Sequence, residues 1–507
     1  MASRLENLDK SILRIIAFFH FTSASLGTPQ VLQLLMVSNT IRKALNLQAC
    51  PGLYADVFYV YFDAALQRVL YPSLTVDRLA PELVHRLHVL RRVHILEFSE
   101  QHLQTDLWTV YLMVLEGGGR NEAQLAMAGI SRFVFTLIRR RFGEEYTRYG
   151  RPLMNEINAL ALWLACLTTS PHTFANETRK GRDELYDLIR PFAIISANCR
   201  QDGFLASQNF SGRSAALSDL SFGIGTSDLS SQGVCEVLLY SERRRMSCPS
   251  ISSASIFLAF LLKDISPLDA PSHLPETLQR KGLTLEDYAL ILESKTPNIA
   301  DRPCQIPLHL DGLIYKDDFS RAVRNSPPGF FFQFQTRAHA PGVLTGVWEG
   351  QFMTSQPAIS DCGPPYSDFI SRHPIQFFLN EEFDSCPEGA LPGNVVGINN
   401  IQHDEDAMIT GESHGTYDQA CGGFRYVGKV RLRDGLIVLK RESVQKSADP
   451  ACHGSWIFEG YVHARCALIG RWYGATQSAN DTRSEGVFCM SKRPDVLVRD
   501  TSWSSRL

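Results

Sequence analysis

Residues 423–440 have the sequence Gly423-Phe-Arg-Tyr-Val-Gly-Lys-Val-Arg-Leu-Arg-Asp-Gly-Leu-Ile-Val-Leu-Lys440, which predicts a β-hairpin. In the first half, apolar residues alternate with mostly charged ones, and this period of two is typical of a strand with one buried face. The pair Asp434-Gly435 separates the two halves. Because glycine accepts the positive φ that a tight turn requires, this pair predicts the turn between two antiparallel strands.

Similar runs recur before and after this hairpin at nearly even spacing. Most are rich in aromatic and β-branched residues and are bounded by Gly, Asp or Asn, as short strands usually are. The expected strands are 346–350, 375–379, 407–411, 423–431, 435–440, 455–462, 467–473 and 486–490. Gly428, Gly460 and Gly470 lie inside these runs and predict sharp bends. We therefore expect residues 342–493 to form one antiparallel β-barrel of about eight strands.

The motif Gly-x-Trp occurs twice in this region, at 346–348 and 470–472. A Trp at the start of a barrel closes one end, and in this respect the region resembles the calycin-like barrels. The ordered segments 409–415, 423–431, 434–440, 456–461 and 470–472 are similar to the C-terminal barrel of a family of fungal F-box-like proteins. They are also similar, more distantly, to the substrate-binding barrel of an animal F-box protein that recognises modified C-terminal ends. This resemblance covers the last third of the chain and implies an F-box near residue 1.

Residues 1–50 have the size of an F-box, a short helical bundle whose apolar strip docks on the adaptor subunit of a cullin-type ubiquitin ligase. Apolar residues recur at helical spacing through Phe19, and Ser38 is a candidate N-cap for a third helix. The adaptor-binding residues implied by the resemblance are Leu8, Leu13, Ile16, Leu32 and Leu35. The segment departs from common F-boxes, because Asn7-Leu8 replaces their Leu-Pro start, the first loop is longer and no Trp follows the third helix. The alternative is that residues 1–50 are the first helical hairpin of the next domain.

The middle of the chain, residues 51–310, is expected to be mainly helical, because apolar residues recur there in stripes at helical spacing. A Ser- and Gly-rich stretch near 202–233 lacks periodicity and predicts a long loop. Further helices are expected at 252–263 and 283–292. Residues 311–341 then form a linker to the barrel, and residues 494–507 form a tail. The expected fold class is multidomain α + β, with a mostly helical N-terminal region followed by a calycin-like barrel.

Composition narrows the function classes. The 507 residues carry a formal net charge of −3, which gives no overall attraction to nucleic acid or an anionic membrane, so neither partner is expected. The 12 Cys are scattered without metal-site spacing and are interpreted as reduced thiols inside a cell. Glu6 and Asp9 precede any apolar run, unlike a signal peptide. The expected location is cytoplasmic or nuclear.

Several residues suggest catalysis or metal binding, and each has a simpler interpretation. Ser413 lies in a Gly-x-Ser-x-Gly sequence, but a hydrolase nucleophile needs a strand-to-helix turn, and here another strand follows. The spacing of His85, His88 and His94 does not place all three on one helix face. The acidic run 403–406 lacks the Gly of a calcium loop. We therefore expect neither a catalytic residue, a metal site nor a cofactor, and the protein is not expected to be an enzyme.

Two hypotheses from different classes remain. The first is a non-catalytic substrate-recognition adaptor of a cullin-type (SCF) ubiquitin ligase, whose partners are the ligase adaptor subunit and an unknown protein substrate. Its expected substrate-binding residues are Trp348, Tyr426, Lys440, Trp456, Tyr461, Arg471 and Trp472, where Lys440 or Arg471 would meet a carboxylate or amide end. The aromatic residues of this set can equally be barrel core. The second hypothesis is a small-ligand-binding barrel, a carrier or enzyme, on a helical scaffold.

Overall fold

The computed structural model describes most of the elements that position the candidate sites. The described residues are 6, 8–22, 31–63, 75–150, 153–168, 178–198, 234–263, 315–323, 339–355, 369–382, 406–413, 423–432, 434–444, 455–475 and 485–493. The loop expected near 202–233, the helix expected at 283–292 and the tail 494–507 lie outside them.

The chain divides into two compact units, and each is assembled from three separate parts of the sequence. Residues 1–173, 201–251 and 307–335 form the first unit, which is mainly helical. Residues 174–200, 252–306 and 336–507 form the second unit, which contains a closed antiparallel β-barrel of eight strands. The helical N-terminal region followed by a barrel is the fold class expected from the sequence.

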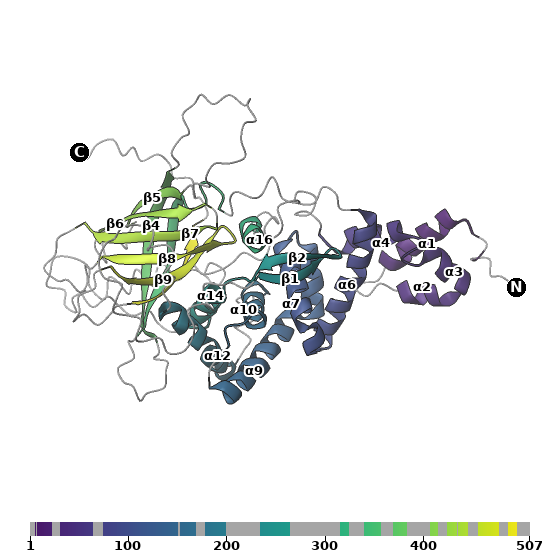
Figure 1. The fold of residues 1–507 in the computed structure, drawn as a ribbon, viewed down its shortest axis with the longest axis horizontal. Helices are drawn as coiled ribbons and strands as arrows, with labels where there is room; N and C mark the ends of the chain where they lie inside the picture. Colours follow the sequence, from purple (N-terminus) through teal and green to yellow (C-terminus); the bar gives the residue numbers. More distant parts are fainter. Residues whose placement is uncertain are drawn as a thin grey trace, which may run out of the picture. The chain divides into compact units, whose positions relative to one another are not determined.

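The barrel strands follow one another in chain order around the closed sheet, and each pairs antiparallel with its neighbours (Figure 1). They are β3 (Gly346–Ser355), β4 (Phe369–Glu382), β5 (Asp406–Ser413), β6 (Phe424–Arg431), β7 (Leu436–Ser443), β8 (Trp456–His463), β9 (Ala467–Gly474) and β10 (Glu485–Lys492). Each strand contains or closely overlaps one of the eight expected runs. The turn between β6 and β7 is also confirmed, because Gly435 has φ +77° and its N–H donates to Arg431 O at 2.7 Å.

The inner face of the barrel is mostly apolar, and its strands approach closely where glycine replaces a side chain. Trp348, Phe377, Tyr426 and Phe458 are among the large side chains of this core, and all are buried. Gly460 and Gly470 are direct cross-strand partners. A Cβ atom on Gly470 would lie 2.0 Å from the carbonyl oxygen of Glu459, so only glycine fits this corner.

One end of the barrel is closed by the segment that precedes β3. The indole Nε1 of Trp348 donates to Leu344 O at 2.7 Å, and Leu344 N donates to the Glu381 carboxylate at 3.2 Å. His339 Nε2 lies 2.8 Å from the other carboxylate oxygen of Glu381, and both side chains are buried. The first Gly-x-Trp motif therefore lies at the closed end, as the sequence predicts.

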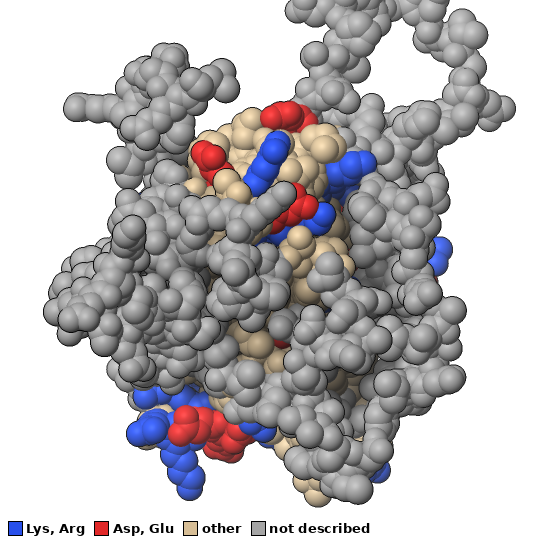
Figure 2. Space-filling view, turned by 90° about the vertical axis from the view of Figure 1, so that its left-hand side faces the viewer, with Lys and Arg blue, Asp and Glu red and all other residues tan. Residues whose placement is uncertain are grey.

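The outer face of the barrel differs between its two sides. On β5, β6 and β7 it carries charges of both signs in cross-strand register, such as Glu412 opposite Arg425 and Arg425 opposite Glu442. On the face drawn in Figure 2, described basic and acidic residues likewise lie next to one another. On β9 and β10, by contrast, the outward residues Ile469, Val487 and Cys489 are fully buried.

The helix α12 (Arg179–Asn198) packs against β9 and β10 within the second unit. Its apolar residues Leu185, Ile189, Phe192 and Ala193 recur at helical spacing and are fully buried. A second helix assigned mainly to this unit, α14 (Ile251–Lys263), begins one residue before the expected 252–263. The barrel is therefore not a free-standing C-terminal fragment, because a helix from the middle of the chain belongs to its packing.

The first unit contains ten described helices, and apolar periodicity predicts most of them. They are α1 (Lys10–Thr22), α2 (Val31–Val37), α3 (Asn39–Leu45), α4 (Pro51–Tyr61), α6 (Val76–His94), α7 (Glu100–Leu115), α8 (Arg120–Ala128), α9 (Ile130–Tyr149), α10 (Glu156–Thr168) and α16 (Lys316–Val323). Ser38 is the N-cap of α3, and its hydroxyl accepts from Ile41 N at 3.2 Å. The helix α16 lies in the segment 311–341 that was expected to be a linker.

A β-hairpin also belongs to the first unit, although the sequence analysis expected helix there. Strand β1 (Val234–Leu239) pairs with β2 (Glu242–Ser247) through the two-residue turn Tyr240-Ser241. Both turn residues have positive φ, +50° and +63°, as this turn requires. Neither is glycine, so the turn lacks the usual sequence signal, and the Arg-rich second strand lacks an apolar stripe.

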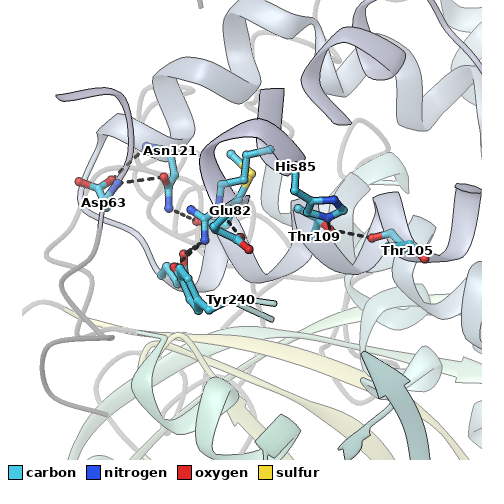
Figure 3. A network of polar contacts seen from close by, with 10 residues as sticks. Asp63, Glu82, His85, Thr105, Thr109, Asn121 and Tyr240 are labelled. Carbon is cyan, nitrogen blue, oxygen red and sulfur yellow. Dashed lines mark hydrogen bonds and ion pairs between the residues drawn. The ribbon is translucent and has the colours of Figure 1, made fainter. Parts of the chain in front are cut away.

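The turn residue Tyr240 anchors the hairpin in a buried polar network, part of which Figure 3 shows. Its hydroxyl donates to Glu116 at 2.9 Å and accepts from Arg86 at 2.6 Å. Arg86 also bonds Glu82 and Glu116, each at 2.8 Å, and contacts the ring of Phe58. Burial raises the pKa of Glu116, and the adjacent Arg86 opposes this effect. One guanidinium thus joins α6, the end of α7 and the hairpin.

The packing of α12 can be tested with Ile189→Asp. An aspartate at this fully buried position removes apolar contacts and buries an unpaired charge, so the barrel unit should lose about 3 kcal/mol or more of unfolding free energy. Proteolysis across a urea series, with cleavage sites mapped to the barrel by mass spectrometry, measures this loss. The control is Glu184→Ala on the exposed side of α12, which should change little. An unchanged barrel in Ile189→Asp would contradict the packing.

The Arg86 network predicts a pH-dependent defect in Arg86→Met. The change leaves two buried carboxylates without their cation and should cost about 3–5 kcal/mol at neutral pH. Losing Arg86 raises the pKa of Glu116 further above its unfolded value, so the folded state binds a proton more tightly. The deficit should therefore shrink as the pH falls from 7 toward 5. Urea unfolding at several pH values measures it, and adding Glu116→Gln should flatten the pH dependence. A deficit that grows on acidification would refute this account.

Candidate functional sites at the barrel end and on helix α1

At the end of the barrel opposite Trp348, aromatic side chains from three strands meet. The rings of Trp456 and Trp472 are stacked, with centroids 4.4 Å apart and an interplanar angle of 27°. Phe352 meets both rings edge-on, at 5.4 Å from each. Trp472 is buried and donates its indole N–H to Met353 O at 3.1 Å, whereas Trp456 is partly exposed. Of these three rings, Trp456 is thus the one whose surface a ligand can reach from solvent.

Arg441 lies inside the barrel beside this group. Its side chain comes from β7, and only 5% of the residue is exposed. The guanidinium carbon lies 3.3 Å from the ring centre of Trp456 and 4.0 Å from that of Phe424. These two rings come from the strands on either side of β7, so the cation is flanked by aromatic faces. We name this set, Phe352, Phe424, Arg441, Trp456 and Trp472, the aromatic–arginine cluster.

The connections between strands distinguish the two ends of the barrel. At the cluster end, four connections leave the strands after residues 355, 413, 443 and 474. At the other end, β6 and β8 are each joined to the next strand by a tight turn, whereas β4 and β5 are joined by the long connection 383–405. Binding residues of a β-barrel commonly lie at the end that carries its longer loops. Four of the five longer connections leave the strands at the cluster end, so topology favours this end as the binding end, although most residues of these connections lie outside the described part of the chain.

The expected substrate-binding residues do not form one site in the structure, because they lie at different places in the barrel. Trp348 and Tyr426 are core residues, and Trp348 belongs to the closed end. Trp456 and Trp472 are brought together in the cluster. Tyr461 was expected among the inner aromatics but lies on the outer face. Its neighbours Gly460 and Val462 face inward, and successive residues of a strand face opposite sides.

The two cations expected to meet a substrate also lie on the outer face of the barrel. Lys440 is exposed and paired with Glu442. Arg471 donates two hydrogen bonds to the buried Glu459 carboxylate, at 3.0 and 2.7 Å. At the cluster end, the inward cation among the described residues is instead Arg441, which the sequence analysis missed. Its signal was available, because Arg441 shares the parity of Ile437 and Leu439 on an alternating strand.

The second candidate site lies on the first helix. Four apolar residues of α1 are exposed: Ile12, Ile15, Ile16 and Phe19, with 56% of Ile15 and 66% of Phe19 accessible. Their spacing places them on one helix face, and we name them the α1 stripe. The opposite face of α1, with Leu13, Ala17 and Phe21, is buried. Met36 and Val37 at the end of α2 are also exposed, so apolar surface is present on both helices.

The helix α4 holds this face of α1 outward. The hydroxyl of Tyr61 donates to Phe21 O at 2.7 Å, and that of Tyr54 donates to Leu45 O at 2.8 Å. The ring of Phe21 also contacts that of Tyr54. These contacts bury the Leu13 side of α1 and leave the stripe on the other side. The N-terminal bundle therefore continues past residue 50 into α4.

The expected adaptor-binding residues fall on different faces of this bundle. Ile16 belongs to the exposed stripe, whereas Leu13 is only 5% exposed and lies in the core. Leu8 and Leu35 are half-buried. The side chain of Leu32 lies outside the described residues. Sequence periodicity detected the apolar residues of α1 but did not identify which of its two apolar faces is covered.

The residues that suggested chemistry have structural contacts. The hydroxyl of Ser413 accepts from Phe424 N at 2.6 Å and contacts Phe424 O at 3.2 Å, so it extends the pairing between β5 and β6. His85 contacts Thr109 Oγ1 at 2.9 Å, and burial lowers its pKa. Most of the acidic run 403–406 lies outside the described residues.

The described part of the chain lacks two further features. It contains no cluster of three or more His, Cys, Asp or Glu side chains that could hold a metal ion. Its helices include none with the length and apolarity needed to cross a membrane.

Comparison with known proteins gives no match: the chain matches no protein-family model, no curated protein and no solved structure. The function is therefore argued from the two sites themselves.

The contacts of Ser413 predict that it is not a nucleophile. A hydroxyl bonded to the backbone of the neighbouring strand has no base beside it among the described residues and lies on no strand-to-helix turn. A fluorophosphonate probe should label the wild-type chain and Ser413→Ala equally weakly. Mass spectrometry of the labelled peptides checks this result. Strong labelling of the wild type that disappears in Ser413→Ala would contradict it.

Proposed function

We propose that the chain is a non-catalytic substrate-recognition adaptor of a cullin-type ubiquitin ligase, in which the N-terminal helices bind the ligase adaptor subunit and the barrel binds a protein substrate. The observation that carries this proposal is the α1 stripe, four exposed apolar side chains on one helix face. The location that goes with this proposal is cytoplasmic or nuclear.

A contiguous apolar helix face in water is a common mark of a protein interface. Isolated exposed apolar residues are ordinary, but the α1 stripe combines three isoleucines and a phenylalanine. Burying one such side chain is worth about 1.5–3 kcal/mol, so a partner groove that covers the stripe gains several kcal/mol. Helices that present anchors at i, i+3, i+4 and i+7 dock in apolar grooves of partner proteins. The stripe follows this spacing through Ile12, Ile15, Ile16 and Phe19.

In this proposal, the partner class is the one implied by the resemblance to fungal F-box-like proteins described in the sequence analysis. An F-box binds its ligase subunit through apolar side chains of short helices, and the described α1, α2 and α3 are short helices near the N-terminus. The departures from common F-boxes lie at Asn7-Leu8 and in the first loop, whereas the stripe lies within α1.

The barrel supplies substrate recognition in this proposal, at the aromatic–arginine cluster. Trp456 gives it an accessible aromatic surface, and Arg441 gives it a cation. Ubiquitin transfer is carried out elsewhere in a ligase, so no catalytic group is required here. In the alternative, a small-ligand carrier, the same cluster would bind the ligand. Against it, the described interior of the barrel is filled by buried aromatic and aliphatic side chains.

Ile15→Asp tests the ligase proposal. Ile15 is 56% exposed, so an aspartate can remain hydrated in the free chain, but it would be buried unpaired in a complex. Co-precipitation of the purified ligase adaptor subunit should fall at least 10-fold relative to wild type. The matched control is Ile95→Asp, the same change at a residue that is 57% exposed at the end of α6, and it should bind like wild type.

The melting temperatures of both variants should stay near that of the wild type, which separates a lost interface from a lost fold. If the wild-type chain fails to retain the adaptor subunit at micromolar concentrations, the ligase proposal is wrong. If both variants bind equally well, the α1 stripe is not the contact surface.

A further inference from the structure

The β1–β2 hairpin has an outer edge along β1. Among the described strands, these two pair with each other and with no third strand (Figure 1). A two-residue turn is closed by a hydrogen-bonded pair, here Leu239 and Glu242, and such pairs then recur at every second position. The N–H and C=O groups of Val234, Glu236 and Leu238 therefore point away from β2. We name these three residues the β1 edge.

The β1 edge faces solvent. Its outward N–H and C=O groups form no hydrogen bond with any described residue. Val234 is 42% exposed, Leu238 is 38% exposed, and the side chain of Glu236 is 68% exposed. Because native proteins leave few buried backbone groups unpaired, these groups are hydrogen-bonded to water. On β2, by contrast, Arg245 and Ser247 make further contacts, and α16 packs against the strand.

Contacts distant in sequence hold the hairpin in place. The turn residue Tyr240 bonds Glu116 and Arg86. The first residue of β2, Glu242, pairs with Arg78 of α6 at 2.5 Å. A peptide that adds to the β1 edge therefore meets a strand that is already ordered, which lowers the entropy cost of binding. Strand addition of this kind draws its affinity from main-chain hydrogen bonds and its specificity from alternate side chains.

The side chains of the β1 edge indicate which peptide fits. An antiparallel strand on this edge places one side chain directly opposite each of Val234, Glu236 and Leu238 on the outer face. Glu236 favours a basic residue opposite it, whereas Val234 and Leu238 favour apolar ones. Arg243 lies 3.6 Å from the Glu236 carboxylate, but both side chains are exposed, so the carboxylate stays accessible to a second cation.

The same carboxylate disfavours a second copy of this chain as the occupant. Two β1 edges that pair antiparallel about a two-fold axis through Glu236 would place the two Glu236 side chains directly opposite each other. Like charges in this position destabilise a sheet, and a charge in the middle of an edge strand is a common protection against self-pairing. The occupant that the edge favours is therefore a different chain.

We propose that the β1 edge binds an extended segment of a partner protein by strand addition, and that this segment carries a basic residue opposite Glu236 with an apolar residue two positions to either side. This site goes beyond the proposed function, because it involves neither the α1 stripe nor the barrel.

Peptides test the proposal on the unmodified full chain. Fluorescein–Gly-Thr-Val-Thr-Lys-Thr-Val-Thr-amide should bind in a fluorescence polarisation titration, about fivefold more tightly than the same peptide with Glu in place of Lys. The N–H groups of its Lys and two Val residues point toward β1, so N-methylation of these three should weaken binding at least 10-fold. N-methylation of three Thr residues, whose N–H groups point away, is the matched control and should change binding less than threefold.

Two variants locate the peptide on the β1 edge. Glu236→Lys should reverse the preference, so that the Glu peptide binds more tightly than the Lys peptide. Leu238→Pro removes an outward N–H but no bond to β2, a position that proline accepts, and should abolish binding. The control Leu238→Thr keeps the backbone donor and should bind the peptide. If Leu238→Pro does not fold, the two methylated peptides decide the question alone.

Several results would overturn the proposal. The absence of binding at millimolar concentration, or equal binding of the two methylated peptides, would exclude strand addition. Equal binding of the Lys and Glu peptides would refute the basic partner. A wild-type dimer in sedimentation that Leu238→Pro converts to monomer would assign the edge to a second copy instead. None of these results bears on the ligase proposal, because co-precipitation of the adaptor subunit depends on α1.

Discussion

The backbone pairing between β10 and β3 is the contact on which the second unit depends, because it closes the sheet. A closed sheet has no free edge, and each strand must then alternate strictly between a narrow interior and the outside. This alternation places glycine at the tightest corners, Trp348 at the closed end and Arg441 beside Trp456 at the other. It also places Arg471 outside, although that residue adjoins Trp472 in the sequence.

Local sequence patterns predicted the barrel strands well, because each strand carries its own alternation and its own turn signals. The same parity could have identified Arg441, since an arginine that follows Ile437 and Leu439 at steps of two must point inward. The β1–β2 hairpin was not predictable in this way. Its turn residue Tyr240 is stabilised by Arg86 and Glu116, which are distant in sequence, and a local window contains neither.

Helix α1 shows a different limit of sequence analysis. It is apolar on two faces, one with Leu13, Ala17 and Phe21 and the other formed by the α1 stripe. Periodicity alone ranks these faces equally, and the contacts of α4 decide between them. The sequence therefore indicates which helix carries the candidate adaptor surface, but only the packing shows which of its residues are exposed.

The place of α12 in the second unit has a consequence for how the chain folds during synthesis. This helix ends at residue 198, whereas the strands that cover its apolar face, β9 and β10, end at residues 474 and 492. At ordinary rates of synthesis, about 5–20 residues per second, the ribosome needs roughly 15–60 s to produce the intervening chain. During that interval Leu185, Ile189 and Phe192 have no β9–β10 surface to cover them, so the nascent chain presents a binding site for chaperones well before the barrel exists.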